Sequence, residues 1–139
     1  MTSPTPGVVG GPKDGTGAVL LIDAANVIGS RPTGWWRDRP GAARSFVDRV
    51  RDAVAAGRIA EHAVVVLEGA ARHGPAAGTS GGVTVVHAPG GGDDTLVAVA
   101  AGASGQVTLV SADRELRRRV EALGAGVAGP GWLLDLLDG

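Results

Sequence analysis

Five acidic residues of this chain come soon after apolar stretches and are the side chains best suited to chemistry: Asp23, Glu68, Asp93, Asp94 and Asp113. Clustered carboxylates repel one another and raise one another's pKa unless a cation offsets their charge. The chain has no cysteine and its three histidines are widely separated, so ligation by oxygen alone favours Mg²⁺ or Mn²⁺. Such an ion polarises a phosphate and activates a water for in-line attack. The acids therefore indicate a metal site that acts on phosphate esters.

The elements that would position these acids are short apolar strands alternating with helices. Residues 19–22 form an uninterrupted apolar run, which suits a strand buried on both faces of a parallel sheet. Further strands are expected at 63–67, 83–86, 107–110 and around Val127, and helices at 40–57, 96–101, 113–124 and 130–137. This alternation predicts a parallel α/β sheet with right-handed crossovers. Because the carboxyl ends of parallel strands share one edge, we expect the acids to converge there.

These residues also have ordinary structural interpretations. Aspartate after a strand often caps the turn that follows, which would account for Asp23 without any function. Asp93 and Asp94 stand at a predicted helix start, where aspartate is favoured as the N-cap and in the first turn. That role explains one of the two better than it explains both. His87 is interpreted as a hydrogen-bonded histidine, and His73 as a surface residue in a Gly/Pro-rich loop over 72–82.

A loop over 28–39 carries two adjacent tryptophans among arginines. Trp35 and Trp36 can stack on bases while Arg37 and Arg39 pair with phosphates, as in proteins that bind single-stranded nucleic acid. The alternative is a tryptophan that closes the core beside solvated arginines. We expect one tryptophan to be buried and the other to be available. The net charge of −1 provides no general attraction to nucleic acid, so binding would need such a local patch.

Length and composition fit one globular domain preceded by a tail. The chain has 139 residues, 44% hydrophobic and 19% charged, which is enough for a core. We expect residues 1–17 to form a flexible N-terminal tail and residues 18–139 to form the domain. The sequence shows no signal-peptide pattern and no apolar run of membrane-spanning length, so we expect a cytoplasmic location. Lys13 is the only lysine beside many Arg, Ala and Gly, which favours a bacterial source with a GC-rich genome.

Three stretches resemble the PIN-like nuclease superfamily, in particular its NYN branch: LIDAANVIG, GGDDTLVAVA and VTLVSADRELRRRV. The resemblance covers residues 18–127. It implies a PIN-like three-layer α/β fold, in which helices flank a mainly parallel central sheet of four to five strands. It also implies metal-dependent hydrolysis of phosphodiester bonds, usually in RNA. The chain departs from the family at Ala24 and Ala25, where a glycine and an aromatic residue are more usual, and at Glu68, where the family often has aspartate.

The resemblance assigns roles to individual residues. The family's first aspartate and its asparagine fall on Asp23 and Asn26, its paired aspartates on Asp93 and Asp94, and its late aspartate on Asp113. We expect the catalytic residues to be Asp23, Asn26, Asp94 and Asp113, and the three aspartates among them to hold Mg²⁺ or Mn²⁺. Asp93 would be a further metal ligand or a partner of one. Asn26 would orient the first carboxylate or the attacking water.

Single-stranded RNA is the expected partner of this site. The residues expected to contact it are Trp35, Trp36, Arg37, Arg39, Ser111 and Arg114, with Ser111 bonding a metal-bound water. The interpretation as a whole is a Mg²⁺- or Mn²⁺-dependent ribonuclease. Two alternatives stay open, namely a non-catalytic PIN-like module that binds RNA or protein, and a metal-dependent hydrolase of small nucleotides. A homodimer or another protein partner is compatible with these functions, and no membrane partner is expected.

Overall fold

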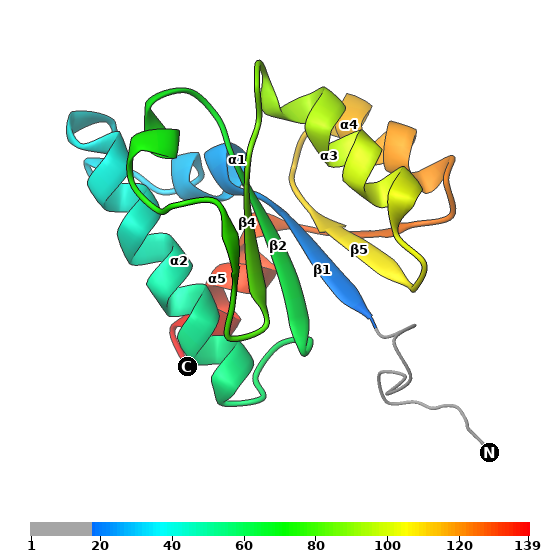
Figure 1. The fold of residues 1–139 in the computed structure, drawn as a ribbon, viewed down its shortest axis with the longest axis horizontal. Helices are drawn as coiled ribbons and strands as arrows, with labels where there is room; N and C mark the ends of the chain where they lie inside the picture. The colour runs from blue at the N-terminus through cyan, green and yellow to red at the C-terminus, as the bar shows by residue number, and fades with distance from the viewer. Residues whose placement is uncertain (1–17) are drawn as a thin grey trace.

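One six-stranded sheet organises residues 18–139, the part of the chain described by the computed structural model (Figure 1). The strands are β1 (Val19–Asp23), β2 (His62–Leu67), β3 (Gly78–Ser80), β4 (Val83–His87), β5 (Val107–Val110) and β6 (Gly126–Ala128). They lie in the order β3-β4-β2-β1-β5-β6. Every neighbouring pair is parallel except β3 and β4. The predicted tail over 1–17 lies outside the described residues.

The sixth strand corrects the expectation of four to five. β3 is antiparallel to β4 and lies within the segment predicted as a loop. Its three residues are all exposed, so it has no apolar pattern that could reveal it. The two strands are joined at Gly81 and Gly82, whose φ values of 59° and 78° suit glycine in a tight hairpin turn. His73 is exposed, and His87 bonds the Pro75 carbonyl at 2.7 Å, so both histidine predictions are confirmed.

The helices are α1 (Ala24–Gly29), α2 (Arg39–Ala55), α3 (Gly92–Gly102), α4 (Arg114–Glu121) and α5 (Pro130–Leu137), with 3₁₀ turns η2 (Trp35–Arg37) and η3 (Gly69–His73). Four of them lie where the sequence predicted helices. α1 was not predicted, because six residues are too few to display a helical apolar stripe. The start of α2 is fixed by Asp38, which accepts from the Gly41 amide at 3.0 Å, and by Pro40 in the first turn.

Helices cover both faces of the sheet and form the three layers that the sequence predicted (Figure 1). On one face, Leu20 and Ile22 of β1 belong to a core that includes buried residues of α1, α2 and α5. On the other face, Leu21 belongs to a second core with residues of α3 and α4. β1 is therefore buried from both sides, as its uninterrupted apolar sequence indicated. None of the helices in residues 18–139 is long and apolar enough to cross a membrane.

The strand register brings the carboxyl ends of the central strands to one edge. Ile22 of β1 pairs with Val65 of β2 and with Val110 of β5. The residues that follow these strands therefore start from the same level of the sheet. This edge holds the candidate site.

Candidate active site

Asp23 is the buried carboxylate at this edge. It ends β1 and caps α1, and only 6% of its surface is exposed. Its Oδ1 accepts a hydrogen bond from the backbone amide of Asn26 at 3.3 Å, and its Oδ2 accepts one from Ser111 Oγ at 2.8 Å. Asp23 therefore has the structural role of a helix cap, as the ordinary interpretation predicted. It is also an almost fully buried carboxylate, which a cap does not require.

The pKa of Asp23 is raised above 3.8, and the largest cause is burial. The hydrogen bonds from Ser111 and Asn26 oppose the rise, while the negative charges of Asp93 and Glu68 add to it. Two further carboxylates therefore act electrostatically on Asp23. An environment of this kind favours a bound cation, which would offset the repulsion.

Ser111 and Asn26 tie β1 to the loop after β5. Ser111 is fully buried, and its hydroxyl also accepts a hydrogen bond from the Asp113 amide at 3.1 Å. The Asn26 side chain accepts from the Ala112 amide at 2.8 Å. Because Ser111 has no exposed surface, the structure gives it a supporting role beneath Asp23 in place of the substrate contact that the sequence predicted. Asn26 thus contacts both segments: its backbone amide donates to Asp23, and its side chain accepts from the loop after β5.

We call Asp23, Glu68 and Asp93 the acidic centre, since the last two act electrostatically on the first. Glu68 directly follows the end of β2. Its Oε1 accepts a hydrogen bond from the backbone amide of Gly92 at 3.2 Å, which links it to the start of α3. A Cβ atom at position 92 would lie 2.7 Å from this oxygen, so the approach depends on glycine. Asp93 follows in the first turn of α3. The sequence signal for Glu68 was its position directly after a predicted strand, which it shares with Asp23.

Asp94 and Asp113 have other partners in this structure. Asp94 is exposed and forms an ion pair with Arg119 of α4 at 3.0 Å. Asp113 caps α4, its Oδ1 accepting from the amides of Glu115 at 3.0 Å and Leu116 at 3.1 Å. Both cap bonds end on the same oxygen, so Oδ2 makes neither of them. The assignment of these two aspartates as metal ligands stays a prediction.

The carboxylates around Asp23 suit a metal ion that keeps most of its water ligands better than an ion bound by protein groups alone. Within residues 18–139, no three Asp, Glu, His or Cys side chains are grouped closely enough to enclose a metal ion. Mg²⁺, however, is usually bound through one or two carboxylates while it keeps several of its waters. Asp23 with the nearby charges of Asp93 and Glu68 fits that mode of binding.

A pocket of about 160 Å³ adjoins the acidic centre on the side of the tryptophan loop. Ala24, Glu68, Trp35 and Arg39 are among the residues that line it. The Arg39 guanidinium lies 5.1 Å from the centre of the Trp35 ring, a distance typical of a cation–π contact. Trp35 and Arg39 are thus within reach of a molecule bound in this pocket beside Glu68.

The second tryptophan faces solvent. Trp36 is 49% exposed, packs edge-on against Trp35 with ring centres 5.8 Å apart, and has Arg37 at 5.9 Å from its ring centre. The prediction of an available tryptophan is confirmed for Trp36. The prediction that the other tryptophan is buried is wrong, because Trp35 is half-buried and lines a pocket. Arg114 is exposed in the first turn of α4, directly after Asp113.

Comparisons with known proteins bear on the fold. No protein-family model matches the chain, and no curated protein matches it in sequence. Among solved structures it is similar to Rae1 (YacP) from Bacillus subtilis, crystallised as a W164L mutant, with 17% sequence identity and a TM-score of 0.69. The match covers 87% of this chain and 75% of that one. At this identity the likeness shows the fold alone, and it confirms the predicted class of a single α/β domain with a mostly parallel sheet flanked by helices.

Proposed function

We propose that this protein is a ribonuclease that hydrolyses RNA phosphodiester bonds at the acidic centre around Asp23, with Mg²⁺ or Mn²⁺ as cofactor. The observation that carries the proposal is a buried carboxylate at the end of the central strand, on which two more carboxylates act. Ionised Asp23 is costly in this position without a cation, and such perturbed groups are concentrated at functional sites. The motifs shared with PIN-like nucleases support the same function.

Asp23 would hold a hydrated metal ion, and Asp93 and Glu68 would add negative charge close to it. When bound, the ion would provide a nucleophilic water at neutral pH and polarise the scissile phosphate. The chain's own contribution is to fix the carboxylate, since Ser111 and the Asn26 amide each hold one of its oxygens. Asp113 would add Oδ2 while Oδ1 continues to cap α4, and Asp94 would add a ligand by leaving Arg119.

Single-stranded RNA is the substrate that the surroundings favour. The pocket beside Ala24 offers Trp35 for stacking and Arg39 for a phosphate or a base, and Trp36 with Arg37 continues this surface into solvent. Base–aromatic stacking needs unpaired bases, which a duplex does not expose. Because the net charge of the chain is −1, such local arginines must supply the attraction to phosphate.

The test compares Asp23→Asn with wild type by Mn²⁺ titration calorimetry and by cleavage of RNA oligomers. Asparagine keeps the size and caps helices well, but removes the charge. We expect loss of Mn²⁺ affinity and of nearly all cleavage. Asp52→Asn, an exposed aspartate of α2, is the matched control and should behave as wild type.

Three outcomes would redirect the proposal. Wild-type protein that binds RNA but neither binds Mn²⁺ nor cleaves RNA would favour a non-catalytic binding module. Preferential hydrolysis of nucleoside triphosphates in a parallel assay would favour a nucleotide hydrolase. An Asp23→Asn variant as active as wild type would remove Asp23 from the mechanism.

A further inference from the structure

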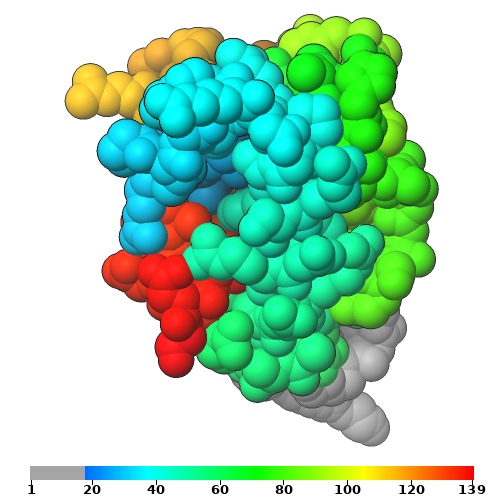
Figure 2. Space-filling model, turned by 90° about the vertical axis from the view of Figure 1, so that its left-hand side faces the viewer, coloured from blue at the N-terminus to red at the C-terminus, as the bar shows by residue number. Residues whose placement is uncertain are grey.

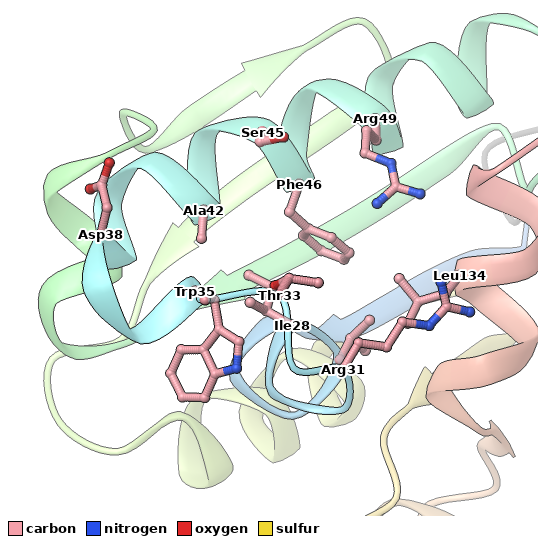
Figure 3. A pocket seen from close by; sticks show the side chains of 12 residues that line it. Ile28, Arg31, Thr33, Trp35, Asp38, Ala42, Ser45, Phe46, Arg49 and Leu134 are labelled. Atoms are coloured by element: carbon pink, nitrogen blue, oxygen red, sulfur yellow. The ribbon is translucent and has the colours of Figure 1, made fainter.

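A second, larger pocket lies on the side of the molecule formed by α1, α2, α5 and the loop before η2. Its volume is about 410 Å³, within the range of sites for small ligands, and Figure 2 shows the hollow between the loop, α2 and the C-terminal helix. Figure 3 shows the side chains that line it. Glu68, Asp93 and the other acids of the candidate active site are not among them. The pocket therefore needs an explanation of its own.

Two arginines from separate elements converge at one end of this pocket. Arg31 comes from the loop after α1 and Arg49 from α2, and both reach toward Leu134 of α5 (Figure 3). Arg31 pairs with Asp138 at 3.3 Å, and Arg49 pairs with the other oxygen of the same carboxylate. Arg31 also lies 3.5 Å from Asp135. The two guanidinium groups thus already bind one anionic group, which is the protein's own.

The rest of the pocket has apolar and aromatic side chains together with the polar side chains of Thr33, Asp38 and Ser45. Phe46 of α2 projects into it beside Ile28, and Trp35 lines the opposite end from the arginines (Figure 3). A planar ring can stack against the half-buried ring of Trp35, whereas Phe46 is only 4% exposed and forms the floor of the pocket. Guanidinium groups, for their part, recognise phosphate through paired hydrogen bonds. The pocket combines both features across its length.

We propose that this pocket binds a nucleotide unit, with the phosphate on Arg31 and Arg49 and the base toward Trp35. In the free protein Asp138 occupies the arginines, and the phosphate displaces it on binding. A phosphate monoester carries more charge than a carboxylate and offers three oxygens, so it satisfies two guanidinium groups better. The same chemistry is found in a free mononucleotide and in the phosphorylated end of an RNA strand.

The pocket is connected to the candidate active site by shared walls. Trp35, Ile28 and Ala42 line both this pocket and the smaller one beside Ala24. A strand whose end is held at the arginines would therefore extend into the smaller pocket beside Glu68. Binding at the arginines requires neither metal nor cleavage, so it can be measured independently of the proposed nuclease function.

The experiment titrates the full chain with adenosine 5′-monophosphate in EDTA, by calorimetry and tryptophan fluorescence. Adenosine is the probe without phosphate. RNA oligomers with a 5′-phosphate or a 5′-hydroxyl, tested on the Asp23→Asn background, distinguish a strand end from a free nucleotide. We expect binding of the monophosphate, and weakening by about tenfold or more in Arg31→Gln and Arg49→Gln, which each lose charge-assisted hydrogen bonds. Asp138→Asn, which removes the competing carboxylate, should bind more tightly.

Controls separate recognition from folding and from general charge. Arg44→Gln removes the same charge from an exposed position of α2 outside the pocket and should bind as wild type does. Ser45→Leu keeps both arginines but narrows the pocket, so it should also weaken binding while circular dichroism stays unchanged. The proposal is overturned if no phosphate-bearing probe binds, if adenosine binds as well as its monophosphate, or if Arg44→Gln weakens binding as much as Arg49→Gln.

Discussion

Replacement of Ser111 by alanine tests the support beneath Asp23. The hydroxyl donates to Asp23 Oδ2 at 2.8 Å and accepts from the Asp113 amide at 3.1 Å, in a side chain with no exposed surface. Alanine preserves the backbone and removes both bonds at once. A hydrogen bond to a charged group contributes about 1.5–3 kcal/mol, and a neutral one about 0.5–1.5 kcal/mol. We therefore expect the free energy of unfolding to fall by about 2–4.5 kcal/mol at neutral pH.

The loss should depend on pH in a defined direction. The bond from Ser111 lowers the pKa of Asp23, so it favours the ionised carboxylate, although burial keeps the net pKa above 3.8. A raised pKa means that Asp23 favours folding at low pH and that this contribution is lost as the pH rises through the folded pKa. Removal of Ser111 raises the pKa further. The difference between variant and wild type is therefore largest when Asp23 is ionised and shrinks as the pH falls through its pKa.

Urea denaturation of both proteins in EDTA, at neutral pH and at stepwise lower pH, measures this difference. Ser30→Ala is the matched control, because Ser30 is exposed and its hydroxyl donates to the Val27 carbonyl at 2.7 Å. An exposed substitution of this kind changes stability by no more than about 0.5 kcal/mol. A Ser111→Ala variant as stable as Ser30→Ala, or a difference that does not change with pH, would refute the reasoning about Asp23.

Three other predictions concern neighbouring residues. Asp113→Ala should lower the free energy of unfolding by about 0.5–2 kcal/mol through loss of the α4 cap, as measured in urea. Trp36→Ala should weaken binding of single-stranded RNA by about 1–3 kcal/mol in a fluorescence titration, whereas Trp132→Ala, on exposed α5 surface, should leave it unchanged. Gly92→Ala should displace the Glu68 carboxylate and lower Mn²⁺ affinity in calorimetry, because its Cβ would lie 2.7 Å from Oε1; unchanged affinity would exclude Glu68 from the metal site.

The sheet and the edge that holds the candidate site could be predicted because apolar runs and strand ends are local features. Leu20, Leu21 and Ile22 of the run over 19–22 are buried between the two helical layers, and Asp23 stands at the predicted end. The central placement of β1 followed from that burial. The exposed β3 and the short α1 could not be predicted, since neither carries a repeating apolar pattern.

The partners of individual side chains could not be predicted, because they come from distant parts of the chain. Asp94 meets Arg119 only once α3 lies beside α4, a contact that no local pattern encodes. Ser111 was expected to face the substrate, but its burial follows from the packing of the β5 loop over Asp23 and Asn26. Glu68 approaches the start of α3 because Gly92 lacks a side chain, and that approach depends on tertiary structure.

The outer strands of the sheet limit how this protein can associate with a second copy. β3 and β6 have three residues each, so both edges offer only a short row of unpaired backbone groups. Long, flat edge strands invite pairing with another chain and lead to aggregation, and short ones discourage it. Sheet extension across two molecules is therefore disfavoured at both ends. A homodimer of this chain would instead form through the helical layers, whose faces present side chains and not open backbone.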